Sequence, residues 1–433
     1  MKKAVFAAVL CAGAGAFAAA PAISNVSISQ AADERSVTIT YDLDAEAIVT
    51  LELQTNGVAL PPEAHWPIAG TVNRRVPAGT RHTAVWRPDR LAEPVDVASV
   101  KPALTAWNVD APPQYMVVPL ALSGAAPSYY ASADMVPYGV TNRMYKTTHL
   151  VLAKIPAAGR TWMVGAVPGE EGTAAREVQR LVTFTSDYYM GIYEFTGGQW
   201  MQFMSSNPSA SHNYDDKDVC PVENCSYATI RNSDYLPTAA PASGSLVAKL
   251  QARTGMALDL PHHAQWEVAA RAGCTGAVNV PGATINQVAW SVGNPASDPK
   301  RASGYYTGNC THEVGLLLPN AFGLYDTQGN VLEIGRGNLY AASAEQNLAS
   351  HGLTAETAKY IVEVEPQLNA QSMTLNGSTV NATYKIGRWG GGWSSANNTN
   401  QSVSRWAYAG GAPYNDTGFR VFCPVANGGR LAQ

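Results

Sequence analysis

The chain has 433 residues, enough for two or three domains, and 46% of them are hydrophobic, so a sizeable core can form. Only 14% are charged and the formal net charge is −4, a balance that excludes the basic surface of a nucleic-acid-binding protein. With 20 Tyr, 10 Trp, 38 Gly and 27 Pro, the composition excludes a disordered chain and favours a turn-rich, β-rich secreted protein.

Residues 1–20 are typical of a signal peptide. Lys2 and Lys3 form a basic start, an apolar stretch follows, and small residues then offer cleavage sites. Cys11 would suit a lipoprotein, but the large Leu10 before it disfavours that processing. No later stretch reaches the ~18 apolar residues of a membrane-spanning helix. We therefore expect a secreted, periplasmic or cell-surface protein without a transmembrane span.

Residues 22–108 are predicted to form an all-β domain. Val37, Ile39 and Tyr41 alternate with polar residues, and residues 49–53 repeat the same period of two. Asn56-Gly57 then indicates a hairpin turn. Several short strands in one such stretch favour a β-sandwich of the immunoglobulin or fibronectin type III kind. The stretch holds no catalytic group of residues, so a spacer or adhesion module is the expected role.

Residues 109–149 are predicted to be a linker with extended, bridging strands, since Ala111-Pro112-Pro113 interrupts the pattern. A larger domain over residues 150–433 follows. Residues 340–385 of that domain have the composition of an insertion.

Three short helices are predicted in the larger domain, each from apolar residues at helical spacing. The first begins at the N-cap Thr196, and the third is closed by Gly273. The three patterns cover residues 194–204, 245–254 and 262–271. Loops and short strands are expected elsewhere.

Five cysteines follow the signal peptide. Two disulfides and one free thiol would suit an oxidising compartment, and we expect the pairs Cys220–Cys225 and Cys274–Cys310, with Cys423 left over. A metal site is the weaker alternative, because no CxxC pair or suitable histidine spacing accompanies these cysteines.

Several motifs of the larger domain resemble the formylglycine-generating, or sulfatase-modifying factor, family. The sequences LPHHAQWEVAAR and NAFGLYDTQGNVLE stand in the family's order with segments at residues 190–196, 221–227, 388–393 and 418–421. The resemblance implies an α+β, loop-rich fold of the C-type-lectin-like kind. It does not extend to the predicted all-β domain.

Oxidase members of this family use a cysteine pair with copper and oxygen to convert a sulfatase cysteine to formylglycine. Counted along the matching motif, the two cysteine positions hold Ser395 and Asn400. A hydroxyl is a hard ligand with a high pKa, so it cannot replace a thiolate on Cu(I). We therefore expect neither copper nor the thiol-oxidase mechanism.

A second branch of the family holds a non-heme iron with three histidines. His262 and His263 are adjacent and would point about 100° apart on a helix, so they cannot chelate as an i, i+4 pair would. His312 and His351 have no ligand spacing either. Surface histidines are the expected interpretation, and iron is not expected.

The family resemblance also implies a structural calcium site. Side-chain oxygens of Asp326 and Glu333, with the carbonyls of Gly329 and Val331, match the family's calcium loop. These hard oxygen donors are of the kind that calcium prefers. The alternative is a tight turn capped by Asp326 without a metal.

Residues 393–408 are rich in Ser, Asn, Trp and Tyr. The resemblance implies that this segment lines the groove in which the family binds its substrate. Such residues combine adaptable polar contacts with rigid aromatic anchors. The alternative is a solvated loop. The candidate ligand-binding residues are Trp393, Ser394, Ser395, Asn397, Asn398, Asn400, Arg405, Trp406 and Tyr408.

Two classes of function compete. The first is a secreted, non-catalytic module that binds a protein, peptide or glycan, with a retroelement-diversified display protein as one version. The second is a divergent metal-dependent oxidoreductase that acts on a protein cysteine. A structural surface or matrix protein is a third, weaker possibility. No nucleic-acid partner is expected.

Overall fold

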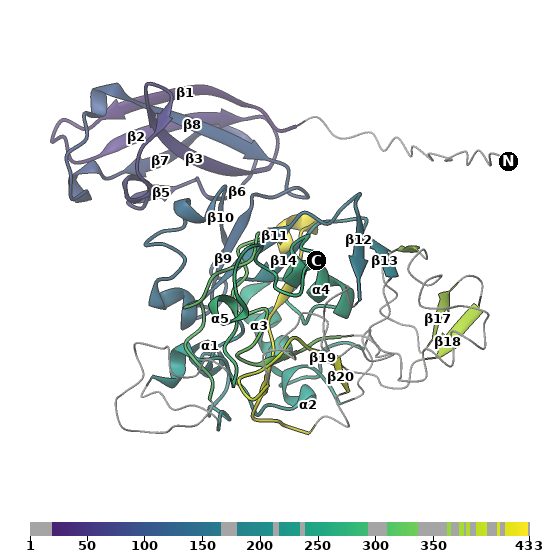
Figure 1. Cartoon of the computed structure of the whole chain (residues 1–433). Coiled ribbons are helices and arrows are strands. Elements are labelled where there is room, and N and C mark those ends of the chain that lie inside the picture. The colour runs from purple at the N-terminus through teal and green to yellow at the C-terminus, as the bar shows by residue number, and fades with distance from the viewer. Residues whose placement is uncertain are drawn as a thin grey trace, which may run out of the picture.

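The computed structural model describes residues 20–165, 180–210, 216–233, 239–292, 310–336, 362–364, 372–375, 378–381, 387–395, 405–407 and 412–431. The predicted signal peptide lies outside these residues, apart from Ala20. Strands are many and helices few and short, so the structure is mixed α/β (Figure 1). Among the described residues, no helix has the length and hydrophobicity needed to cross a bilayer.

Two antiparallel sheets make up an N-terminal β module over residues 23–107 (Figure 1). One has the order β1-β2-β7-β5; in the other, β3 lies between β4 and β6 and also pairs with β8. The strands are β1 (Ile23–Gln30), β2 (Val37–Leu43), β3 (Ala47–Thr55), β4 (Val58–Ala59), β5 (Ile68–Gly70), β6 (Arg74–Val76), β7 (Gly79–Trp86) and β8 (Val100–Trp107).

The core of this module follows the predicted alternation. Val37, Ile39 and Tyr41 are fully buried together with Val49 and Leu53 of the other sheet. The predicted turn is present between β3 and β4, where Asn56 and Gly57 both have positive φ, the backbone conformation that a two-residue hairpin needs. The immunoglobulin or fibronectin class of the module stays a prediction.

The segment predicted as a linker is part of the larger domain's central sheet. That sheet has the order β10-β9-β11-β14-β22 and joins the middle of the chain to its end. Its strands are β9 (Tyr115–Pro119), β10 (Ser128–Tyr130), β11 (His149–Ile155), β14 (Tyr188–Gly191) and β22 (Phe422–Pro424).

Both faces of the central sheet are buried, and its strands are accordingly apolar at successive positions. Met116 and Leu152 belong to one core cluster, whereas Val117 and Val151 belong to the other. Helix α3 (Leu246–Thr254) contributes Leu250 to the first cluster, and α4 (His263–Arg271) contributes residues to the second. A sheet covered by helices on both faces explains the continuous hydrophobic strands.

The helices agree with the predicted positions but are shorter at some ends. Thr196 caps α1 (Gly197–Met201) in a capping box, and Ser245 caps α3. Helix α4 ends at Arg271, as predicted, and both Ala272 at the left-handed cap position and the following Gly273 have positive φ. The remaining helices are α2 (Tyr227–Ile230) and α5 (Ile285–Val288).

A four-stranded sheet has the order β20-β19-β15-β21 and includes residues of the motifs that resemble the family. Its strands are β15 (Leu332–Ile334), β19 (Gly387–Trp389), β20 (Arg405–Ala407) and β21 (Thr417–Gly418). Smaller sheets contain β12 (Thr161–Val164), β13 (Arg180–Thr183), β16 (Val362–Val364), β17 (Ser372–Leu375) and β18 (Ser378–Asn381).

Candidate functional site

A buried ion pair lies at the centre of the motif region. Glu333 on β15 accepts from Arg420 twice, at 2.7 Å from Nε and at 2.5 Å from Nη2. Trp266 of α4 donates its indole N–H to the same carboxylate at 2.6 Å. Glu333 and Arg420 are each only 1% exposed. This bidentate geometry is the strong form of a charge pair, and it ties α4 to β15 and to the end of the chain.

Two further carboxyl groups are buried beside this pair. Glu194 accepts from the side chain of Asn330 at 2.7 Å and from the backbone N–H of Val331 at 3.0 Å. Burial, and then the proximity of Asp326 and Glu333, raise the pKa of Glu194 well above its usual range. Three acidic side chains thus surround one arginine.

Asp326 has one satisfied and one unsatisfied oxygen. Its Oδ2 accepts from the backbone N–H of Gly315 at 2.7 Å, whereas its buried Oδ1 has no hydrogen-bond partner. Burial raises the pKa of Asp326 to about 6. Asp326 also has a positive φ of 54°, which suits an aspartate in a tight turn.

The predicted calcium ligands meet the requirements of calcium in part. The orphan oxygen of Asp326 is a hard donor in a region with an excess of negative charge. A cation there would coordinate this oxygen and would also compensate the negative charge. The oxygens of Glu333, in contrast, are already held by Arg420 and Trp266. Within the described ranges, no three His, Cys, Asp or Glu side chains come together as a metal site. Calcium stays a prediction, with Asp326 as its better-placed carboxylate.

Ser395, which stands where the resemblance places the first of two cysteines, has a structural role in a backbone turn. Ser395 accepts from the backbone N–H of Gly392 at 3.0 Å through Oγ, and its own N–H donates to the carbonyl of Gly392 at 2.9 Å. Its carbonyl accepts from Val292 at 3.1 Å. The hydroxyl therefore closes a tight turn. Asn400, the second position, lies outside the described residues.

The structure describes part of the predicted ligand-binding surface. Trp393 is half-buried and donates its indole N–H to the carbonyl of Asn415 at 3.1 Å, while Ser394 is exposed. Val292 beside this turn is 45% exposed. The backbones of Arg405 and Trp406 lie on β20 next to β19. The other predicted residues, Asn397, Asn398 and Tyr408, lie outside the described residues.

A second charge group supports the turn that carries Trp393. Arg388 on β19 donates to Asp416 at 3.0 Å and lies over the ring of Tyr414, 4.4 Å from its centre. Ser394 reaches the other oxygen of Asp416 at 3.4 Å. Sequence reasoning did not find Arg388 or Asp416, or the central Arg420 and Glu194. All but Asp416 lie within or beside the family motifs, but their partners are far away in the sequence.

The histidine prediction was wrong for the residues that the structure describes. His262, His263 and His312 are each at most 4% exposed and so are not surface histidines. His262 is buried because its ring is the N-cap of α4 and accepts from the backbone N–H of Ala264 at 3.3 Å. His312 stacks on Trp290 with 4.0 Å between ring centres. His351 lies outside the described residues.

The two expected disulfides are also absent. Cys220 and Cys274 are free cysteines, and their thiols lie near the carbonyls of Asp216 and Val278, at 3.8 and 3.2 Å. Burial raises the pKa of the Cys220 thiol well above its usual range. Cys423 is likewise buried, with its thiol 3.3 Å from the carbonyl of Gly429. A buried, protonated thiol is a poor nucleophile.

Comparison with known proteins identifies the motif region. A family profile for the "Sulfatase-modifying factor enzyme 1-like domain" matches residues 157–424, more than half of the chain. No curated protein matches the chain.

Three solved structures are similar over most of their own lengths. PvdO from Pseudomonas aeruginosa is 20% identical, with a TM-score of 0.41, and the match covers 63% of this chain and 94% of that one. Treponema denticola variable protein 1 is 19% identical, with a TM-score of 0.43 and coverage of 64% and 96%. CarF is 16% identical, with a TM-score of 0.37 and coverage of 65% and 99%.

Proposed function

The chain belongs to the sulfatase-modifying factor family, and from this premise we propose that it is a secreted, non-catalytic protein that binds a protein, peptide or glycan through the surface around Trp393. The observation that carries the proposal is the role of Ser395. This residue stands where the family resemblance places the first catalytic cysteine, and its hydroxyl closes a backbone turn with Gly392.

The chemistry of three buried thiols elsewhere in the domain supports a non-catalytic role. Thiol oxidation requires an accessible thiolate. Cys220, Cys225 and Cys423 are buried, and burial raises the pKa of each thiol. None of these three cysteines belongs to the turn that holds Trp393 and Ser395.

The described part of the surface supports the proposed binding role. Trp393 is held in place by two hydrogen bonds, from its backbone N–H to Asn330 at 2.7 Å and from its indole to Asn415. A half-buried, fixed tryptophan offers contact area at little cost in conformational entropy. Exposed Ser394 and Val292 lie beside it and add polar and apolar contacts.

The binding test uses the full mature chain on glycan and peptide arrays. We expect Ser394→Tyr to abolish binding of the ligands that the wild type retains, because a bulky ring then covers the surface. Thr80→Tyr, an exposed hydroxyl on β7, is the matched control and should bind like the wild type. Retention of every ligand by Ser394→Tyr would contradict the proposed surface.

The competing oxidoreductase function has a separate test. Oxygen consumption is followed with copper and a cysteine-containing peptide. We expect no turnover by the wild type and no change in Cys423→Ser. Copper-dependent oxygen uptake that produces an aldehyde on the peptide would overturn the non-catalytic proposal.

Calcium at Asp326 is proposed as a structural ion. The orphan Oδ1 of Asp326 would coordinate the ion, and the ion would neutralise the carboxylate's charge. It would thereby stabilise the loop from residue 326 to residue 333. Its test is the thermal midpoint of unfolding, measured with calcium and with a chelator.

A further inference from the structure

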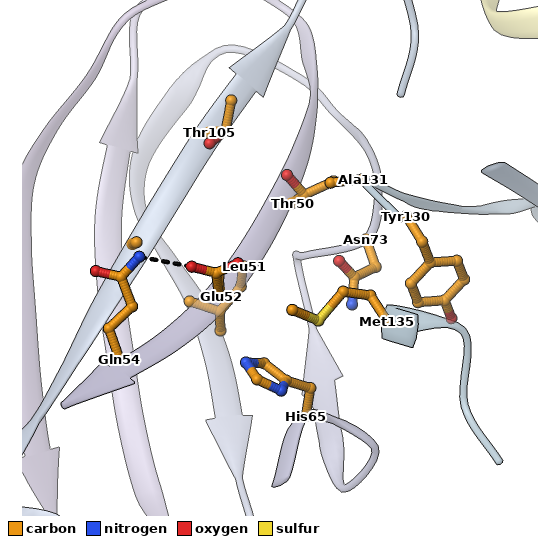
Figure 2. Close-up of a pocket in the computed structure, with 11 residues that line it drawn as sticks. Thr50, Leu51, Glu52, Gln54, His65, Asn73, Thr105, Tyr130, Ala131 and Met135 are labelled. Atoms are coloured by element: carbon orange, nitrogen blue, oxygen red, sulfur yellow. Dashed lines mark hydrogen bonds between the residues drawn. The ribbon is translucent and has the colours of Figure 1, made fainter. Parts of the chain in front are cut away.

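A cavity of about 160 Å³ lies between the N-terminal β module and the segment that includes β10 and the 3₁₀ helix η4 (Ala133–Met135) (Figure 2). The residues that line this cavity are different from those that form the surface around Trp393. Strands β3 and β8 line one side, and the 3₁₀ helix η1 (Pro62–His65) contributes His65.

The cavity follows from the two faces of β3. Val49, Leu51 and Leu53 belong to the core of the β module. The alternate residues point to the opposite face, since side chains alternate along a strand. On that face Ile48 belongs to a core cluster of the larger domain, whereas Thr50, Glu52 and Gln54 line the cavity. The β module therefore packs closely against the larger domain at the Ile48 end of β3, and the cavity lies between them toward the Gln54 end.

The opposite side is fixed by contacts between the two parts. Tyr129 donates its backbone N–H to the carbonyl of Asn73 at 2.9 Å. The rings of Trp66 and Tyr138 lie 5.1 Å apart. Met135 therefore faces the polar row of β3 across the cavity, and Tyr130 lies behind it with its ring turned away from Glu52 (Figure 2).

Two polar walls are held rigidly. The Nε2 of His65 accepts from the backbone N–H of Leu53 at 2.8 Å, so Nδ1 carries the proton and faces the carbonyl of Pro61 at 3.2 Å. Trp107 donates to the hydroxyl oxygen of Thr50 at 2.9 Å, which leaves the Thr50 proton to be donated elsewhere. Thr105, directly opposite Thr50 on β8, adds a second hydroxyl at the exposed mouth.

Glu52 is the charged group of the lining. Its carboxylate accepts from Gln54 at 2.5 Å, and no cationic side chain pairs with it in the part of the chain that the structure describes. A carboxylate with spare acceptor sites, two hydroxyls and an amide can bind several neighbouring hydroxyl groups. Met135 provides an apolar contact on the same cavity.

We propose that this cavity binds one sugar ring, whose hydroxyls meet Glu52, Gln54 and Thr105 and whose C–H face meets Met135. A neutral polyhydroxylated ring offers the same mixture of polar and apolar surface as the lining. The cavity is smaller than the ~300–1,000 Å³ of drug-sized ligand sites, which selects a single ring over several. The ring is either a free monosaccharide or the terminal residue of a glycan.

Saturation-transfer NMR and calorimetry on the full mature chain test the proposal. The probes are free glucose, galactose, mannose and N-acetylglucosamine, and glycans that end in each of them. We expect one of these rings to bind, and Glu52→Gln to raise its Kd at least about tenfold through loss of charge-assisted hydrogen bonds. Tighter binding of the glycan than of its free ring would identify the terminal residue as the natural source, and equal binding the free sugar.

Thr105→Val provides a second variant at an exposed position, where the fold is not at risk. It should also weaken binding, whereas Glu63→Gln, an exposed carboxylate on η1 outside the lining, should not. Absence of binding by every probe at millimolar concentration would overturn the proposal. So would binding that Glu52→Gln and Thr105→Val leave unchanged. Binding of choline instead, lost in Glu52→Gln but kept in Thr105→Val, would assign the cavity to an organic cation and contradict the sugar.

Discussion

Arg75 on β6 donates from Nη1 to Oδ1 of Asn427 at 2.6 Å, so a residue of the N-terminal β module is fixed to one near the end of the chain. The adjacent Gly428 donates to the carbonyl of Val109 at 2.8 Å and accepts from the hydroxyl of Tyr129 at 2.6 Å. The β module is thus held against the larger domain by specific hydrogen bonds, which a swinging spacer would lack.

Tyr129→Phe should lower the free energy of unfolding by about 1–3 kcal/mol, because it leaves the buried carbonyl of Gly428 without its donor. Tyr138→Phe is the matched control. Tyr138 is 58% exposed, and loss of its hydroxyl should change little. Urea unfolding followed by fluorescence gives both values. Equal stability of the two variants would argue against a tight junction.

Arg420→Met should destabilise the protein by about 3–5 kcal/mol, since it leaves the carboxylate of Glu333 buried without its cation. Arg143→Met removes an exposed pair with Asp216 and should cost at most about 1 kcal/mol. The comparison uses chemical denaturation at neutral pH. A small effect of Arg420→Met would mean that the pair is more solvated than its 1% exposure implies.

The calcium proposal predicts different behaviour for the two carboxylates. Calcium should raise the thermal midpoint of the wild type, and Asp326→Asn should remove that response, because the amide retains the shape but not the charge. Glu333→Gln should lower the midpoint both with calcium and with chelator, since it weakens the pair with Arg420. A wild-type midpoint that is the same in calcium and in chelator would rule the ion out.

His65 should make the stability fall in mild acid. Burial lowers the pKa of His65, so the unfolded state takes up its proton first, near pH 6.5. The stability is therefore fully present above pH 6.5 and is lost as the pH falls, by at most about 1.4 kcal/mol per unit from this group. In His65→Gln, which keeps an acceptor for Leu53, the loss between pH 7 and pH 5 should be smaller. Parallel curves for the two proteins would refute this role.

Local sequence patterns were sufficient for the strands of the β module, for the three predicted helices and for the family. The alternation in Val37, Ile39 and Tyr41 predicted a buried strand face, and Thr196 is the predicted cap of its helix. Such signals depend on neighbours a few residues apart, where the periodicity of strand or helix fixes which side chains share a face. The family motifs are similarly local, and the family profile match confirms them.

Only the tertiary structure decided which groups meet. Glu333 and Arg420 are 87 positions apart, and Glu194 and Asn330 are separated by 136. No local pattern encodes such a pairing, because burial and charge compensation depend on how the sheets pack. The same reason explains why the buried His262 was taken for a surface residue and why the cavity beside Glu52 could not be foreseen. The sequence specified the donors and acceptors, and the packing of β3, β15 and the chain end determined their partners.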